Sequence, residues 1–285
     1  MLKKSAKNLL KKHAILPSKG LGQNFLADKK IIERIVRAAG IKADETVLEI
    51  GPGLGVLTVK LAKLAKKVVA VEKDQRITEV LKNLLVGQNV ENVEIIHGDI
   101  LKFNPASCSL KPKSYKIAAN LPFYLTAAVI RKFLEEDRPP KEMILVVQKE
   151  VGQRICAEPP RMNLLAVSVQ FYAKAKIISH ISKKSFWPRP KVDSVIIRII
   201  PGPFPQQLRE RFFIIVKAGF SQPRKQLTNN LKKINPDRET IENWLVKNSI
   251  KPSSRAENLG VNDWLNLCKS FGMVDKTCYN KNKGN

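Results

Sequence analysis

The sequence predicts an α/β protein in which a mostly parallel, Rossmann-like sheet ends in an antiparallel hairpin and is followed by a small all-α domain. Three observations lead to this prediction. As far as residue 148, short β-branched runs alternate with helical stretches, which is typical of a parallel sheet covered on both faces. Two later extended runs have no long helix between them. Residues 208–272 show only helical periods and turn signals.

The first helix is predicted to begin after Asp28 and to end at Gly40, because aspartate favours a helix N-terminus and glycine a C-terminus. Five strands of the parallel sheet are then expected at residues 46–50, 68–72, 93–96, 116–119 and 143–148. The helical patterns between them lie at residues 56–65, 75–86 and 126–136. The antiparallel hairpin is predicted from residues 164–173 and 192–200.

Composition divides the chain into four segments. The first nineteen residues contain six lysines and no acidic residue, so residues 1–18 are interpreted as a basic N-terminal arm. A marginal amphipathic helix or a transit peptide is the alternative. The Pro-rich stretch 201–205 indicates a domain boundary. Residues 19–204 are therefore expected to form the α/β domain, residues 205–272 the helical domain, and residues 273–285 a frayed tail.

The charge balance points to a polyanionic partner. The 285 residues include 51 Lys and Arg against 25 Asp and Glu, a formal net charge of +26, and 44% apolar residues allow for a buried core. Such a surplus speeds encounter with nucleic acid, although a basic ribosome-associated or membrane-surface protein without chemistry has the same composition. No apolar run reaches the ~18 residues of a membrane span, and no signal peptide is recognisable. The scattered Cys and His residues indicate no metal site, so we expect a cytoplasmic protein that needs no metal.

The first strand runs directly into the glycine-rich sequence Gly51-Pro52-Gly53-Leu54-Gly55. In an open α/β sheet this crevice binds nucleotide-like ligands, and glycines let the backbone approach a ligand closely. The third glycine comes too early for the dinucleotide pattern Gly-x-Gly-x-x-Gly, whose last position is Val56 here. A tight strand–helix turn is the alternative explanation for this loop when it is considered alone.

Two carboxylates follow the next two strands. Glu72 closes the second strand, where it can accept hydrogen bonds from both hydroxyls of an adenosine ribose. Asp99 follows the third strand, where it can accept from the amine of the cofactor's adenine. Each alone could be a solvated strand-end acid or a turn former. In register with Gly51 and Gly53, they favour S-adenosylmethionine over NAD, and hence a methyltransferase that releases S-adenosylhomocysteine.

The fourth strand ends in Asn120-Leu121-Pro122-Phe123-Tyr124. The N6 amine of adenine is a poor nucleophile, because its lone pair is delocalised into the ring. The side-chain oxygen of Asn120 and the backbone carbonyl of Leu121 could accept its two N–H bonds and aim the lone pair. Pro122 restricts the preceding residue to extended geometry, and Phe123 offers a face on which the base can stack. The predicted catalysis is positioning and electrostatics rather than strong acid–base chemistry.

This turn resembles the adenine-N6 methyltransferase signature in its ribosomal RNA form. The flanking segments resemble the ribosomal RNA adenine dimethyltransferase family, whose small-subunit enzyme modifies two adjacent adenines near the 3′ end of 16S RNA. The resemblance covers residues 19 to about 268. It rests also on the segments Lys19–Leu26, Val147–Val151, Phe186–Ser194 and Phe220–Lys225.

The resemblance implies roles for individual residues. Asn24 and Leu26 would close over the cofactor, and Asn120 would serve both cofactor and adenine. Phe123 and Phe186 would sandwich the flipped base, although a core or loop-anchoring role is the alternative for Phe186. The family more often has Tyr at the Phe123 position, so the missing hydroxyl is expected to tune activity rather than abolish it.

A basic cluster is predicted in the helical domain. Arg224, Lys225, Lys232 and Lys233 are expected on one side of a helix that starts near Pro223. The cluster coincides with the segment that the resemblance implies in RNA contact, whereas a merely solvated face is the alternative. The expected partner is 16S rRNA within the small ribosomal subunit or its precursor. We expect a monomer with no membrane association.

Two other functions stay open. The related large-subunit adenine methyltransferase of the macrolide-resistance type shares the fold and the chemistry. The Gln23–Leu26 stretch before the first helix, the Phe186–Ser194 segment and a sizeable C-terminal domain favour the small-subunit enzyme. The third candidate is a non-catalytic RNA-binding member of the fold, against which the intact glycine loop with Glu72, Asp99 and Asn120 argues.

Overall fold

The computed structural model describes residues 8, 10–11, 15–18, 20, 22–235 and 237–271. The chain divides into two compact units, residues 1–153 with 173–202, and residues 154–172 with 203–285. Residues 154–172, which the predicted boundaries assign to the α/β domain, thus belong to the second unit. Most of the expected N-terminal arm and all of the expected tail, 273–285, lie outside the described residues.

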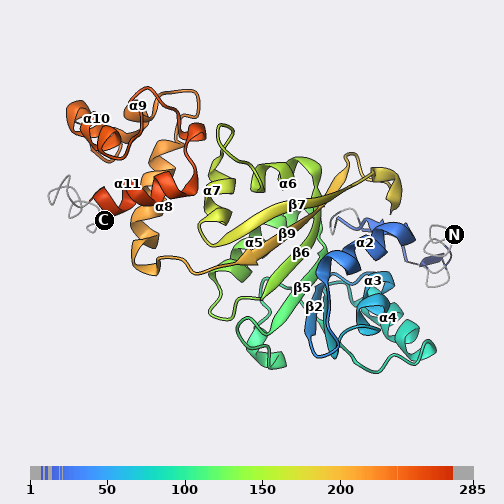
Figure 1. Ribbon diagram of the computed structural model, residues 1–285. Helices are drawn as coiled ribbons and strands as arrows, with labels where there is room; N and C mark the ends of the chain where they lie inside the picture. The colour runs from blue at the N-terminus through green and yellow to red at the C-terminus, as the bar shows by residue number, and fades with distance from the viewer. Residues whose placement is uncertain are drawn as a thin grey trace. The chain divides into compact units, whose positions relative to one another are not determined.

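The first unit is built on a large mixed sheet (Figure 1). Within the described residues this sheet has seven strands in the order β4-β3-β2-β5-β6-β9-β7. All neighbours from β4 to β6 are parallel, whereas β9 is antiparallel to both β6 and β7. The strands are β2 (Thr46–Ile50), β3 (Lys67–Glu72), β4 (Val93–His97), β5 (Tyr115–Asn120), β6 (Glu142–Gln148), β7 (Ala173–Ile181) and β9 (Ser194–Pro201). The predicted fold class is confirmed.

The strand register brings the carboxyl ends of the central strands to one edge. Ile50 at the end of β2 is level with Val71 of β3 and Ala119 of β5. The next residues along these three strands are Gly51, Glu72 and Asn120. The three residues, which the sequence predicts in one site, therefore lie side by side at one edge of the sheet.

The helices of the first unit begin and end close to the predicted positions. In α2 (Lys29–Ala39) the Asp28 side chain accepts from the Lys30 N–H over 3.0 Å, and Gly40 ends the helix with φ of 49°. The other helices here are α3 (Val56–Ala62), α4 (Gln75–Gly87), α5 (Thr126–Glu135) and α6 (Lys149–Ile155), which contains the boundary between the units. Three 3₁₀ turns are η1 (Pro105–Cys108), η2 (Phe123–Leu125) and η3 (Lys183–Ser185).

The core of the first unit forms where helices pack on the sheet. Ile31 and Ile35 of α2 and Leu61 of α3 belong to one buried cluster with Ile144 of β6 and Ile196 of β9. These residues are at most 3% exposed. Burying such side chains contributes about 1.5–3 kcal/mol each, so α2 and α3 are firmly anchored against the sheet. In Figure 1 they group on one side of it with α4.

The strand predicted at residues 164–173 is wrong. Residues Leu164–Gln170 form the helix α7, and Asn163 caps it by accepting from the Ala166 N–H over 3.0 Å. The periodicity of a short apolar run does not distinguish a buried strand from a buried helix. Here the Asn163 cap favours the helix. The hairpin partner of β9 is β7 instead, which begins only at Ala173.

A small antiparallel ribbon that the sequence did not predict lies beside the large sheet. It consists of β1 (Phe25–Leu26) and β8 (Phe186–Trp187). Leu26 is level with Phe186, and both side chains belong to the same buried cluster as α2. The ribbon therefore fixes the segment before α2 against the loop that follows β7.

The second unit is helical. Its further helices are α8 (Arg209–Gly219), α9 (Leu227–Leu231), α10 (Arg238–Lys247) and α11 (Val261–Ser270), with the 3₁₀ turns η4 (Gln206–Leu208) and η5 (Ala256–Asn258). Phe212, Leu227 and Trp264 are fully buried in it. A Cβ added at Gly219 would lie 2.3 Å from the Trp264 ring, so a glycine there allows α8 and α11 to pack closely. Across both units, no helix in the described ranges is long and apolar enough to cross a membrane.

Candidate functional site

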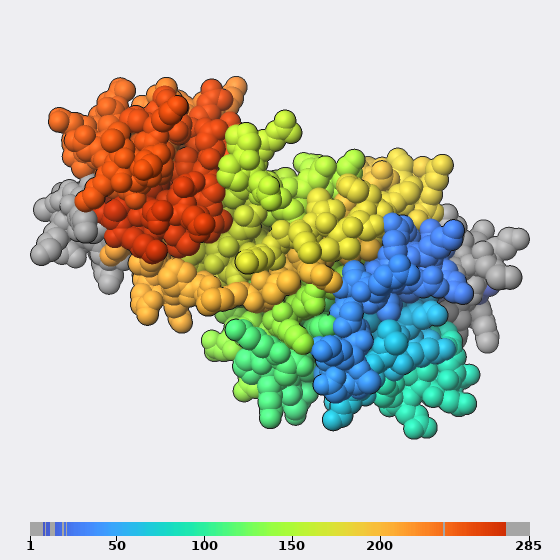
Figure 2. All heavy atoms as spheres, viewed as in Figure 1, coloured from blue at the N-terminus to red at the C-terminus, as the bar shows by residue number. Residues whose placement is uncertain are grey.

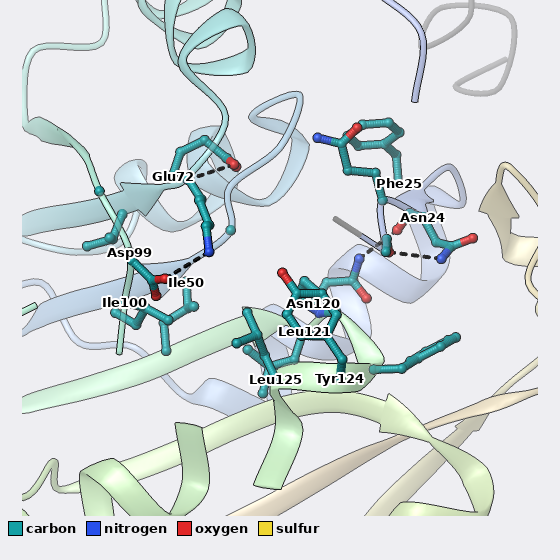
Figure 3. A pocket seen from close by; sticks show the side chains of 18 of the residues that line it. Asn24, Phe25, Ile50, Glu72, Asp99, Ile100, Asn120, Leu121, Tyr124 and Leu125 are labelled. Carbon is teal, nitrogen blue, oxygen red and sulfur yellow. Dashed lines mark hydrogen bonds and ion pairs between the residues drawn. The ribbon is translucent and has the colours of Figure 1, made fainter. Parts of the chain in front are cut away.

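A cleft lies in the first unit at the carboxyl ends of β2, β3 and β5. Its empty volume, which includes the open solvent at its mouth, is about 810 Å³. Figure 3 shows Glu72 and Asp99 on one side, Asn24 and Phe25 on the other, and Asn120 between them. The predicted site residues that line it are Asn24, Gly51, Glu72, Asp99, Asn120, Leu121, Pro122, Phe123 and Phe186.

The glycine loop shapes the floor of the cleft. Gly51 has φ of +66°, and a Cβ added there would meet nothing within 4 Å, so the backbone faces open space. Gly53 has φ of +55°, and a Cβ there would lie 3.1 Å from the Phe25 ring. Gly53 does not line the cleft directly but donates its N–H to Glu72 Oε2 over 3.2 Å. The loop therefore positions the Glu72 carboxylate and also leaves open space in front of Gly51.

The Glu72 carboxylate is buried at the end of β3. Its Oε1 accepts from the N–H groups of Lys73 (2.9 Å) and Asp74 (3.0 Å). Burial raises the pKa of Glu72, although these bonds and the one from Gly53 act in the opposite direction. A carboxylate has about four lone-pair sites, so Glu72 can still accept from a ligand hydroxyl.

Asp99 forms an ion pair with a cation that the sequence analysis did not single out. Lys73 Nζ lies 2.8 Å from Asp99 Oδ2, and Asp99 Oδ1 accepts from the Leu101 N–H over 2.9 Å. The hydrogen bond from Lys73 is the main cause that lowers the pKa of Asp99. Asp99 is therefore a carboxylate at neutral pH and can accept from an amine.

The turn after β5 has a fixed amide at its start. Asn120 Nδ2 donates to the Asn24 carbonyl over 2.9 Å. Its Oδ1 makes no hydrogen bond within the part of the chain that the structure describes, so this oxygen is the acceptor left for a ligand. The turn is held by the bond from the Leu121 N–H to the Val146 carbonyl (3.2 Å). The bond from the Leu125 N–H to the Pro122 carbonyl (3.0 Å) closes it.

The segment before α2 covers this turn. Asn24 Nδ2 donates to the Gly22 carbonyl over 3.0 Å, and a Cβ added at Gly22 would lie 3.3 Å from Pro122 and 3.6 Å from the Tyr124 ring. Lys19 and Leu21 of the same predicted motif lie outside the described residues. Leu26 faces the buried core and a smaller neighbouring cavity, not the cleft.

The two predicted stacking rings both border the cleft but differ in their surroundings. Phe186 is only 3% exposed and belongs to the buried cluster with α2, so it is also a core residue. Phe123 begins η2 and is partly exposed. Sequence reasoning missed Phe25, Lys73 and Tyr124 as lining residues, although Phe25 and Tyr124 stand inside motifs that it quoted.

The predicted basic cluster lies in the second unit, and none of its members lines the cleft. Arg224, Lys225, Lys232 and Lys233 are all exposed. The prediction of one helix that starts near Pro223 is wrong. Lys225 closes a turn by donating to the Gln222 carbonyl over 2.9 Å, and α9 covers only Leu227–Leu231. The four cations therefore flank the two ends of a short helix.

Comparison with known proteins agrees with this geometry. A family model described as ribosomal RNA adenine dimethylase matches residues 17–272. A ribosomal RNA small subunit methyltransferase A from Dehalococcoides mccartyi is 39% identical, with 92% of this chain and 91% of that protein covered. A protein of the same name from Bacillus pumilus is 40% identical, with 92% and 93% covered.

Two solved structures share most of the architecture. A dimethyladenosine transferase from Plasmodium falciparum superposes with a TM-score of 0.73 and 28% identity, covering 88% of this chain and 98% of that one. The 23S rRNA methyltransferase ErmE superposes with a TM-score of 0.71 and 27% identity, covering 86% and 98%.

Proposed function

The chain belongs to the ribosomal RNA adenine dimethylase family, and on this premise we propose that it methylates two adjacent adenines near the 3′ end of 16S rRNA at N6. The product would be N6,N6-dimethyladenosine, formed during assembly of the small subunit by a monomeric enzyme. The observation that carries the proposal is the Asn120 amide. Its nitrogen is engaged by Asn24, and its oxygen remains as an acceptor in a cleft that also holds Glu72 and Asp99.

The cleft fits S-adenosylmethionine as the methyl donor. The buried Glu72 carboxylate would accept from the ribose hydroxyls, and Asp99 would accept from the adenine amine. The open space in front of Gly51 leaves room for a ligand against the loop, and Asn24 and Leu26 belong to the segment that would close over it. When bound, S-adenosylmethionine supplies an electrophilic methyl group on a positively charged sulfur and leaves as S-adenosylhomocysteine.

The chain's own residues would hold and aim the target base. Asn120 Oδ1 would accept one N6–H and the Leu121 carbonyl the other, which localises the nitrogen lone pair. Pro122, with φ of −56°, restricts Leu121 to extended geometry. Phe123 and Phe186 would stack on the base, which is worth about 1–3 kcal/mol per base on an aromatic ring. The base must leave its stack to enter the cleft, as in other enzymes that modify bases.

A large-subunit adenine methyltransferase of the macrolide-resistance type is the second candidate, because ErmE is similar in structure. The curated relatives named for the small subunit are more similar in sequence, at 39–40% identity against 27%. This difference supports the small-subunit substrate. A non-catalytic RNA-binding role is the third candidate, and the acceptor groups in the cleft count against it.

The deciding experiment supplies unmodified small and large ribosomal subunits separately, with a methyl donor labelled on its methyl group. Nucleoside mass analysis of the recovered RNA identifies the product. We expect labelled dimethyladenosine in small-subunit RNA alone. Labelled adenine in large-subunit RNA alone would favour the second candidate, and no label in either, from a protein that still binds both RNAs, would favour the third.

A further inference from the structure

The exposed side of α2 carries cations at helical spacing. Lys30, Arg34 and Arg37 follow the i, i+4, i+7 pattern that places side chains on one face of a helix, and all three are exposed. Arg34 shows where this face points. Its Nη1 donates to the Ser179 hydroxyl over 2.6 Å and to the His180 carbonyl over 3.3 Å. The cationic face of α2 therefore looks toward β7.

β7 is the outermost strand of the sheet and adds two exposed lysines on the same side. Lys176 is the cross-strand partner of Arg198, and Arg198 donates to the Ala38 carbonyl of α2. Cross-strand partners point to the same face of a sheet, so Lys176 lies on the face that α2 covers. Lys174 stands two residues before Lys176 and points to the same face, because side chains alternate between the faces of a strand. Figure 2 shows α2 in blue directly beside β7 in yellow.

Together these residues form what we name the α2–β7 stripe: Lys30, Arg34, Arg37, Lys174 and Lys176. None of them forms an ion pair with another described residue. Glu33 is the one exposed acid on α2. Lysines on an edge strand guard against strand-to-strand association, but this reason does not apply to the arginines of a helix. The stripe therefore keeps the positive charge of all five side chains, although Arg34 also joins α2 to β7 through its hydrogen bonds.

The stripe starts close to the cleft in the sequence. Lys30 comes only a few residues after Asn24 and Phe25, which line the cleft. From Lys30 to Arg37 a helix advances about 10 Å along its axis. Lys174 and Lys176 stand near the start of β7, level with the start of β6, so the stripe leads from the side of the cleft toward the opposite edge of the sheet. Resting on the function proposed above, we propose that the α2–β7 stripe binds the phosphodiester backbone of the rRNA that flanks the target adenines. Contacts of this kind position an RNA without reading its sequence.

The test replaces Arg37, Lys174 and Lys176 by Gln together and keeps Arg34, because it joins α2 to β7. The probe is an unmodified 3′-terminal fragment of 16S rRNA with a fluorescent label, and its Kd is measured from low to high salt. Three lost phosphate contacts should reduce the slope of log Kd against log salt by about 2 and weaken binding about tenfold or more near physiological salt. Turnover at saturating RNA should stay near the wild-type value.

A matched control removes the same charge from exposed, unpaired lysines elsewhere in the first unit: Lys63, Lys66 and Lys82, each changed to Gln. This control should keep the wild-type slope, and so should the charge-preserving pair Lys174→Arg and Lys176→Arg. Equal melting temperatures of all variants verify that they fold alike.

Two results would contradict the proposal that the α2–β7 stripe binds RNA. The first is a slope and Kd for the triple variant that match those of wild type and control. The second is unchanged affinity for the RNA fragment with reduced affinity for whole subunits, which would identify an acidic protein partner. Failure of the proposed function is recognised separately, because wild-type protein would then transfer no methyl group to saturating RNA whatever the salt slope.

Discussion

The Asn120 side chain combines two tasks in one amide. Its Nδ2 donates to the Asn24 carbonyl, and its Oδ1 remains for the contact with the target amine that we propose. We expect Asn120→Ala to lower turnover at saturating RNA by on the order of 10²-fold or more, the loss typical of removing one preorganised polar group. Affinity for the methyl donor, measured by calorimetry, should fall far less than turnover, because Glu72 and Asp99 remain to bind the donor. Asn104→Ala is the control, because Asn104 is an exposed cap of η1. Normal turnover in Asn120→Ala would contradict the assigned role.

Glu49 gives a residue-scale prediction about stability. It is 1% exposed, and its Oε2 has no partner among the described residues. Burial raises the pKa of Glu49 to about 8, and the nearby Glu72 charge adds to the effect. The unfolded chain loses this proton near 4.5. The folded protein therefore binds more protons between these two values, and its free energy of unfolding falls as pH rises from about 4.5 to about 8.

Glu49→Gln cannot ionise and should escape this loss. Near pH 5 its melting temperature should lie close to that of the wild type, whereas at pH 8 it should be more stable by a few kcal/mol. Thermal unfolding at both pH values measures the difference. The exposed Glu91→Gln is the matched control. A stability gain of the same size at both pH values would count against the buried, protonated carboxyl.

At the same scale, the sequence indicated most of the polar residues of the cleft. Glu72 and Asn120 end parallel strands, and Asp99 comes two residues after another. Because the carboxyl ends of parallel strands share one edge of a sheet, the proximity of these residues follows from the pattern. The position of Phe25 could not be predicted in this way. Its proximity to Gly53 depends on how the segment before α2 folds back against the sheet, which the sequence pattern does not indicate. The pairing of Lys73 with Asp99 is likewise a matter of side-chain direction.

At the scale of elements, the glycine loop and the β1–β8 ribbon depend on each other. A Cβ at Gly53 would lie 3.1–3.2 Å from Phe25 ring atoms. Gly53→Ala should therefore push the ribbon from its place and weaken methyl-donor binding, which calorimetry measures. Gly40→Ala has a similar positive φ but meets nothing within 4 Å. Both variants should lose about 1 kcal/mol of stability from the backbone strain. Equal donor affinity in both would exclude the steric link.

Helix and strand boundaries were predictable where capping residues and β-branched runs agreed. Asp28 and Gly40 mark the two ends of α2 as expected. Residues 164–173 were wrongly predicted as a strand, because an apolar run of this length suits either element. The residue that favours a helix, the capping Asn163, stands just before the run. The helix expected from Pro223 failed for a similar reason. A turn ending at Lys225 delays α9 to Leu227, and only backbone hydrogen bonds reveal this.

At the scale of the whole molecule, the net charge of +26 predicted a polyanionic partner but not the surfaces that meet it. Among the described residues, each unit has a candidate for such a surface. The α2–β7 stripe belongs to the first unit, and the exposed residues Arg224 and Lys225 belong to the second. If both contact the same RNA through separate phosphates, their contributions to log Kd should add.

The last prediction tests the surface of the second unit in the full chain. Arg224→Glu with Lys225→Glu should weaken binding to the 16S rRNA fragment and reduce the salt slope by at least about 1.5, because two phosphate contacts are lost. The control reverses two other exposed lysines of the same unit, Lys217 and Lys251. Combined with the triple stripe variant, the changes in binding free energy should sum to within about 0.3–0.5 kcal/mol. A slope that matches that of the control would show that this segment contacts no phosphate, and RNA affinity would then rest on the first unit.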